Sequence, residues 1–225
     1  MSSLLNKTAS VMHKQHGYFV SDGWKDAPMG SYGTKDADVY EGLDQIKNVD
    51  KGVPDPITHS IVRTPRWFLD DGVSTGNWKV GAGVPGGLVS LSVTVEFSSK
   101  YSIACFLSSY NEVRMDNTDA VGDALAALYR EKGTDWKLNR KWVYAALKVN
   151  QGFIVMSQEK DTKVTLSGKG TVNASGVPVT IDVAGFQSGA TSSVEFVGLD
   201  GISPFVNLAE VYDPIFRKAD WRQIG

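Results

Sequence analysis

The stretch GLVSLSVTVEFSSKYSIACFL, residues 87–107, decides how the rest of the sequence is interpreted. Its apolar residues alternate with polar ones, the apolar members being Val89, Leu91, Val93, Val95 and Phe97. Strict alternation is typical of a β-strand with one apolar and one polar face. After a polar turn at residues 98–100 the alternation resumes with Tyr101, Ile103, Cys105 and Leu107. The stretch therefore predicts two strands that pair as a β-hairpin.

Two kinds of structure are compatible with this pattern. The apolar face could pack on the core of an antiparallel sheet, which is the commoner use of such strands. It could also lie in lipid while the Ser/Thr face lines water, since each strand has the roughly ten residues that a tilted membrane strand needs. The rest of the sequence has to decide between the two.

The composition describes an ordinary globular chain. Of its 225 residues, 42% are hydrophobic and 21% are charged, which suffices for one substantial core. The formal net charge of -2 and the absence of a long Lys/Arg run argue against a nucleic-acid partner. Cys105 is the only cysteine, so disulfides and cysteine-based zinc sites are excluded and an intracellular compartment is expected. Residues 1–20 do not have the pattern of a signal peptide, and no apolar run approaches the twenty or so residues of a membrane helix.

The first third of the chain predicts one helix followed by loops. Leu4, Leu5, Val11 and Met12 recur at helical spacing, so an amphipathic helix is expected over Ser3–His16, packed on the domain or lying on a membrane surface. His13 and His16 stand on one face of this helix, but no further ligand accompanies them, and no metal site is predicted. Residues 17–56 are rich in Gly, Asp, Lys and Pro and predict loops with only short regular pieces.

A glycine run precedes the alternating stretch and formally matches a dinucleotide-binding motif. Residues 81–86 read Gly-Ala-Gly-Val-Pro-Gly, which fits G-x-G-x-x-G. The motif works through a helix that follows it, whose free N–H groups receive pyrophosphate. Pro85 and then the alternating strand follow here, so we reject the motif and expect a chain reversal instead.

The second half predicts a helix and a block of strands. Residues 116–132 form the clearest helix, with Asp116 or Thr118 as cap and Gly133 as its end. An interrupted strand is expected earlier, at residues 61–69, where Pro65 confines it to an edge. The strands expected after the helix cover residues 142–149, 153–158, 163–166, 177–186, 193–197 and 204–212. The fold class predicted is therefore α+β, with a twisted and mainly antiparallel sheet.

This order of elements resembles the pore-forming domain of the gasdermins. The phrase Trp-Val-Tyr-Ala-Ala-Leu-Lys-Val at residues 142–149 resembles the family's Val-Tyr-Val-Val strand, and Asp200-Gly201 followed by Phe205-Val206-Asn207-Leu208 resembles its glycine turn and final strand. Asn207 stands where the family often has arginine, and no cysteine lies near the amino terminus. The resemblance covers roughly residues 4–212, and the large carboxyl-terminal repressor domain of animal gasdermins has no counterpart.

The resemblance implies a single-domain pore former of the fungal or bacterial kind. It implies a pore-forming domain at residues 1–212, followed by a short tail at 213–225. Phe216 and Trp221 belong to an apolar stripe of this tail, which is expected to act as a weak latch at most. It implies an effector of pyroptosis-like cell death and immunity that is cytoplasmic until it reaches the plasma membrane or a bacterial inner membrane. The partners expected are anionic lipids, further copies of this chain or of a related chain, and an activating protease. No cofactor is expected.

Two sets of residues are predicted to meet the membrane. The resemblance and the alternation together assign strand insertion to Val89, Leu91, Val93, Val95, Phe97, Tyr101 and Ile103, and to Val143, Ala145, Leu147 and Val149 in a second hairpin. Lys7, Lys14, Arg63 and Arg66 are expected to contact lipid head groups, because basic residues near a membrane surface attract anionic lipids. Arginines of this kind also often make surface ion pairs of little energetic weight.

Catalysis finds no support in the sequence. There is no Gly-x-Ser-x-Gly elbow and no histidine with an evident Ser or Cys partner, so an enzyme is not expected. The alternative function is a β-rich binding module that presents aromatic residues to a carbohydrate or a protein, with Trp24, Trp67 and Trp78 as candidates. A binding module of that kind would leave anionic vesicles intact.

Overall fold

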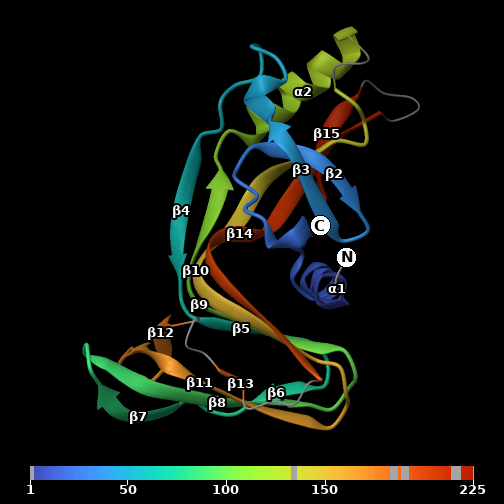
Figure 1. The fold of residues 1–225 in the computed structure, drawn as a ribbon. Helices are drawn as coiled ribbons and strands as arrows, with labels where there is room; N and C mark the ends of the chain where they lie inside the picture. The colour runs from blue at the N-terminus through green and yellow to red at the C-terminus, as the bar shows by residue number, and fades with distance from the viewer. Residues whose placement is uncertain (1–2, 133–135, 183–186, 189–192, 214–218, 225) are drawn as a thin grey trace.

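The structure is a computed structural model that describes residues 3–132, 136–182, 187–188, 193–213 and 219–224. Within these ranges it is mixed α and β, with mostly antiparallel strands, as the sequence predicts (Figure 1). The helices are α1 (Ser3–His16) and α2 (Thr118–Lys132), with short 3-10 turns at Asp22–Trp24 and Ile46–Asn48.

The larger of two sheets forms the body of the molecule. Its strands follow the order β15-β14-β1-β3-β2-β10-β9-β4, with β5 also pairing to β9. Because β14 pairs with β10 as well, the strands β10, β2, β3, β1 and β14 close on themselves. The bounds are β1 Phe19–Ser21, β2 Ser31–Asp36, β3 Val39–Gln45, β4 Thr58–Arg63, β5 Arg66–Leu69, β9 Ser102–Met115, β10 Lys141–Ser157, β14 Val194–Tyr212 and β15 Asp220–Ile224.

The smaller sheet lies beneath the lower part of the larger one (Figure 1). Its order is β12-β11-β8-β6, with β13 pairing to β11 and β7 to β8. The bounds are β6 Val73–Thr75, β7 Lys79–Val84, β8 Leu88–Phe97, β11 Thr162–Val172, β12 Pro178–Ile181 and β13 Gln187–Ser188. The apolar face of β8 packs on Ala104 and Phe106 of β9 and on Phe153 of β10, so a core fills the space between the two sheets.

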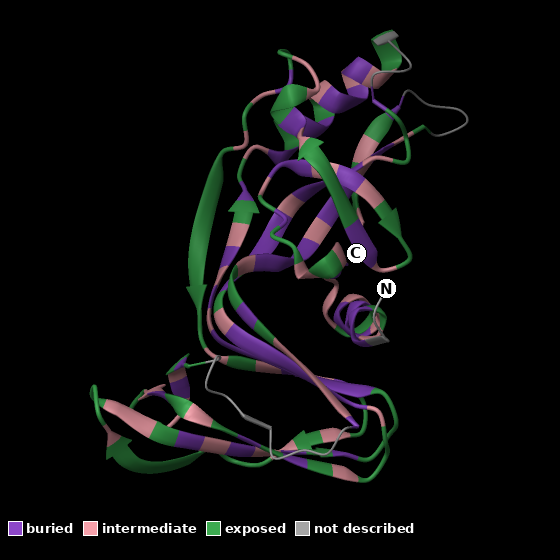
Figure 2. Ribbon diagram, in the orientation of Figure 1, coloured by how far each residue is buried: buried purple, intermediate pink, exposed green. Residues whose placement is uncertain are grey.

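Helix α1 covers the opposite face of the larger sheet. Its buried side chains Leu4, Leu5 and Met12 pack in one cluster with Ile103 and Cys105 of β9. The apolar stripe predicted from helical spacing is therefore the buried face, and it rests on the domain. The central strands are consequently buried on both faces, as the run of buried residues along β9 and β10 shows (Figure 2).

Helix α2 lies at the other end of the larger sheet. Val121 and Leu125 are buried against Trp136 and Trp142, which gives a separate cluster. The helix begins at Thr118, within two residues of its predicted start. Asn117 fixes this start, since its side chain accepts a hydrogen bond from the Ile57 amide and donates one to the Asp55 carbonyl.

Two sequence-based predictions about local structure were wrong. The strands β8 and β9 exist, but they do not pair as a hairpin: β8 pairs with β11, β6 and β7, and β9 pairs with β10, β4 and β5. Residues 17–56 contain the short strands β1, β2 and β3 between loops, which are the short regular pieces expected there, and Val20, Val39 and Tyr40 are buried in them. The strands expected at 142–149 and 153–158 form one strand, β10, and those at 193–197 and 204–212 form β14.

Candidate functional site

A single register runs through both sheets. In the larger sheet Ser102 of β9 lies opposite Ser157 of β10, and in the smaller sheet Phe97 of β8 lies opposite Thr162 of β11. The gap between the sheets is residues 98–101 on one strand and 158–161 on the other, so both strands cross it in the same number of residues. Continuing the register of β9 and β10 across the gap gives the pairing found for β8 and β11. The two sheets are therefore one antiparallel ribbon folded over at a corner.

The strands beside this ribbon follow it around the corner. Ser157 of β10 lies opposite Val194 of β14, and Gly170 of β11 lies opposite Ile181 of β12. Between these two pairs each strand advances by thirteen residues, so β11–β12 continues the register of β10–β14. The short strand β13 departs from it, with Leu166 opposite Ser188. On the other side of the ribbon, β4 and β5 pair with β9, and β6 and β7 pair with β8. The register changes by three residues there, between the pair Leu69–Ala104 and the pair Val73–Phe97.

Left-handed backbone conformations mark the corner on three neighbouring strands. The φ angles are 76° at Gly72, 55° at Tyr101 and 56° at Asp161. Side chains other than glycine seldom adopt positive φ, because Cβ then crowds the backbone. Tyr101 and Asp161 each hold a conformation that an extended strand would not require.

These residues shift the alternation of side chains by one position. On β8 the odd-numbered residues, such as Val93 and Val95, point into the core between the sheets, but on β9 the even-numbered Ala104 and Phe106 do so. Ile103 instead faces α1. In the sequence, the odd-numbered residues of 89–97 and of 101–107 are all apolar, without this shift, although Ala104 and Phe106 are apolar as well. Its pattern thus suits a straight strand as well as the folded one.

The residues predicted for the first membrane hairpin lie around this fold. Leu91, Val93, Val95 and Phe97 are buried between the sheets, and Val89 is half-buried near the end of β8. Tyr101 is exposed at the corner, with 48% of its surface accessible. Ile103 is buried beneath α1. In the folded chain, almost all of the predicted lipid-facing side chains are therefore covered by protein.

The residues predicted for the second hairpin lie elsewhere. Val143, Ala145, Leu147 and Val149 are buried in β10 on the far side of the corner from β8. The ribbon register pairs Val89 with Gly170 and Phe97 with Thr162, so β11 is the neighbour of β8. The membrane-inserting residues predicted from the sequence include none on β11, although Lys163, Thr165 and Ser167 alternate there with Val164 and Leu166.

Two of the four predicted head-group residues are held by carboxylates. Lys7 pairs with Asp70 at 2.8 Å, and Arg63 pairs with Glu112 through its Nε at 2.9 Å and through its Nη2. Lys14 is exposed at the end of α1, and Arg66 is exposed and lies 4.9 Å from the Phe68 ring. The structure does not bring the four together into one basic cluster.

A buried carboxylate anchors the arginines beside α1. Only 8% of the Glu112 side chain is exposed, and burial raises its pKa. The hydrogen bonds donated by Arg63 and Arg114 outweigh burial and hold the pKa of Glu112 below its ordinary value. Glu210 behaves alike: burial opposes ionisation, but hydrogen bonds from Lys141 and Arg222 lower its pKa.

The tail predicted as a latch adds a strand to the larger sheet. β15 pairs antiparallel with β14, from Leu208 opposite Ile224 to Tyr212 opposite Asp220. Trp221 packs against Trp142 and against Gly122 of α2, where a Cβ would come within 2.4 Å of the indole. The other proposed latch residue, Phe216, lies outside the described residues.

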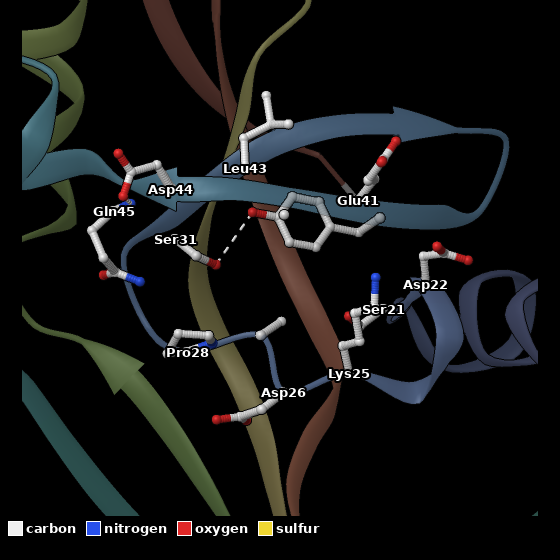
Figure 3. A pocket seen from close by; sticks show the side chains of 13 residues that line it. Ser21, Asp22, Lys25, Asp26, Pro28, Ser31, Glu41, Leu43, Asp44 and Gln45 are labelled. Carbon is white, nitrogen blue, oxygen red and sulfur yellow. Dashed lines mark hydrogen bonds between the residues drawn. The ribbon is translucent and has the colours of Figure 1, made fainter.

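A hollow of about 260 Å³ opens beside β2 and β3 (Figure 3). Tyr40 forms a hydrogen bond of 3.2 Å with Ser31 at its base, and burial raises the pKa of Tyr40 to about 12. Asp22, Asp26 and Asp44 also border it. Two of these carboxylates are held by hydrogen bonds within the chain: Asp26 accepts one from the Ser203 amide, and Asp44 accepts one each from the Gln45 amide and the Asn48 side chain. We assign no ligand to this hollow.

Neither a membrane helix nor a metal site stands out in the part of the chain described. No helix there is long and apolar enough to cross a membrane. Within the same ranges, no three His, Cys, Asp or Glu side chains gather closely enough to hold a metal ion.

Comparisons with known proteins were made with both the sequence and the fold. No protein-family model and no curated protein matches the sequence. Among solved structures the fold is similar to a chain of the gasdermin A3 membrane pore, over 99% of this chain and 95% of that chain, with 9% identity and a TM-score of 0.39.

Proposed function

We propose that this chain is a non-catalytic, membrane-permeabilising protein whose folded ribbon straightens on an anionic membrane. The observation that carries the proposal is the register, which continues from β9–β10 to β8–β11 across the corner. Because β9–β10 and β8–β11 already share one pairing frame, the corner could open without these paired strands slipping past each other. Opening would also remove the shift in alternation and place the odd-numbered apolar residues of 89–97 and 101–107 on one face.

The straightened ribbon would be long enough to reach through a bilayer. At roughly 3.3 Å per residue, a strand of ten residues such as β8 suffices when tilted. Its turns would enter first, since Gly86 and Gly87 lie between β7 and β8 and Gly176 lies between β11 and β12. Val93 and Leu166 would face lipid, and Ser92 and Ser167 would face water.

This geometry favours β11 as the second inserting strand. β11 pairs with β8 along their whole shared length, whereas the upper part of β10 holds Val143 and Val149 within the body. The assignment of Val143, Ala145, Leu147 and Val149 to a membrane hairpin stays a prediction. A charged side chain at one of these buried positions should reduce dye release by destabilising the larger sheet, and not by blocking membrane insertion.

Assembly into a ring is proposed through the free edge of β4. β4 is a terminal strand of the larger sheet and its six residues are all exposed. Val62 is 80% exposed and Ile61 is 38% exposed, while Arg63 is paired with Glu112 and His59 with Asp116. An open strand edge whose basic side chains are already paired can accept another strand, so a further copy of this chain is the expected partner.

Dye release from anionic vesicles tests the proposal with a matched pair of variants. Val80 lies opposite Leu91, so both side chains share a face, yet Val80 is 44% exposed in the folded chain. Val80→Lys should fold normally and release little dye, because lysine at a lipid-facing midplane position costs about 2–4 kcal/mol per chain. Thr165→Lys places the same charge on the polar face and should release dye like the parent. Equal release by both variants, or no release by the parent, would refute the proposal.

The edge is tested by a second pair. Val62→Lys should leave binding to anionic vesicles intact but reduce the crosslinked oligomers that form there, because a charge on the edge opposes strand pairing. Leu43→Lys is the control, since Leu43 is 58% exposed on β3, away from β4. If Val62→Lys forms as many crosslinked oligomers as the parent, β4 is not the edge through which the copies pair.

A further inference from the structure

An aromatic cleft opens between the two sheets, away from the corner. It has a volume of about 620 Å³. Trp67 of β5 and Phe106 of β9 line it from the larger sheet, and Trp78 and Val177 line it from segments that lead into β7 and β12 of the smaller sheet. The cleft is therefore bounded by both halves of the folded ribbon.

The wall of the cleft is a cluster of contacting aromatic rings. The rings of Trp67 and Trp78 stack on each other, at an interplanar angle of 23° with centroids 6.1 Å apart. Phe106 contacts both, with its centroid 4.7 Å from Trp67 and 5.1 Å from Trp78. Trp67 and Trp78 pack against the core between the sheets but are only partly buried, so each indole keeps an accessible part that lines the cleft.

The rim of the cleft is polar but uncharged. Thr75, Asn77 and Ser175 line it, and their side chains make no hydrogen bond with the rest of the described chain. None of the described residues lining the cleft carries a charge. A cleft of several hundred cubic ångströms with aromatic walls and a few polar groups is typical of small-molecule sites. The lack of charge disfavours phosphates, carboxylates and ammonium groups.

We propose that this cleft binds a neutral carbohydrate, with a pyranose ring packed against the accessible parts of the Trp67 and Trp78 indoles. The C–H face of a pyranose is apolar and suits an indole surface, while its hydroxyl groups need donors and acceptors at the edge. Asn77 offers both a donor and an acceptor, and Thr75 and Ser175 offer hydroxyl groups. A sugar uses both parts of the lining.

The position of the cleft gives the bound sugar a further role, which rests on the proposed function. A ligand that contacts Trp67 on one sheet and Trp78 on the other binds the folded ribbon and not the straightened one. It therefore stabilises the folded form by mass action. At a hundredfold excess over its dissociation constant, the sugar should slow vesicle leakage about a hundredfold.

Titration of the intact chain in solution tests the binding. The probes are three neutral trisaccharides, namely maltotriose, cellotriose and N,N′,N″-triacetylchitotriose, followed by tryptophan fluorescence and calorimetry. At least one should bind saturably, and Trp67→Ala and Asn77→Ala should each weaken it tenfold or more. Asn77 is exposed, so its variant should fold even where the tryptophan variant does not. Trp24→Ala is the control, since Trp24 lies near α1, and should leave the affinity unchanged.

Three results would overturn the cleft proposal. They are the absence of saturable binding by all three sugars, binding that Trp67→Ala and Asn77→Ala leave unchanged, and uptake of an apolar probe such as 1-octanol with no sugar bound. The proposed function fails separately. If the chain binds a sugar but releases no dye, the cleft proposal stands and the proposed function fails. If it releases dye but binds none of the sugars, the proposed function stands and the cleft proposal fails.

Discussion

Tyr101 is the residue on which the folded corner depends most directly. Its φ of 55° costs free energy because the residue has a Cβ. Tyr101→Gly should therefore stabilise the folded chain relative to Tyr101→Ala by about 1 kcal/mol, since both variants lose the ring but only glycine tolerates this conformation. Urea unfolding measures the difference. Tyr101→Gly should also release dye more slowly than Tyr101→Ala. A glycine variant less stable than the alanine variant would show that the corner is not strained here.

Glu112 makes the stability of the folded chain depend on pH. Its folded-state pKa is lowered from the model-compound value of 4.5, so its contribution is present above pH 4.5 and is lost as pH falls through the lower folded pKa. The urea midpoint of the parent should fall in that acid range. Glu112→Gln should lower stability at neutral pH by about 1–3 kcal/mol and flatten the acid slope. If the stability of Glu112→Gln falls with acid as steeply as that of the parent, other carboxylates such as Glu210 cause the pH dependence.

Among the elements, β15 and α2 are joined by a close contact that a single methyl group can break. A Cβ on Gly122 would come within 2.4 Å of the Trp221 indole. Glycine-to-alanine changes usually favour a helix, but Gly122→Ala should instead cost about 1–3 kcal/mol, because overpacking displaces Trp221. Limited proteolysis should then cut near β15 sooner. Gly83→Ala, whose Cβ would lie 3.8 Å from the nearest atom, is the control. Higher stability of Gly122→Ala would contradict the close packing of β15.

The elements that could be predicted from the sequence are those with strong local signals. The span Ser3–His16 and the strand β8 followed from apolar spacing, and α2 followed from its apolar face. The strands β1 to β3 could not be predicted, because their glycines and acids resemble a loop and only tertiary packing buries Val39 and Tyr40. β15 was hidden for a similar reason, since five residues carry too little pattern without β14 beside them.

For the molecule as a whole, the pairing of the strands was the main feature that the sequence could not predict. The alternation at residues 87–107 continues in phase through the turn, so it predicts neighbours in one sheet. The corner depends on positive φ at Tyr101 and Asp161, where no glycine marks it. The β8 residues of the candidate site could therefore be named from the sequence, but their pairing with β11 could not, because a register between distant segments is a long-range property.

The proposed function requires the folded ribbon to become one straight ladder in the membrane. Ser90 and Ser109 lie equally far from the corner, on β8 and β9. The folded arms hold them within about 30 Å, whereas a straight strand at roughly 3.3 Å per residue separates them by about 60 Å. Spin labels at Ser90→Cys and Ser109→Cys, in a Cys105→Ala background, report this distance by pulsed electron resonance. We predict the short distance in solution and the long one in vesicles that have released their dye. A short distance that persists in leaking vesicles would contradict the account.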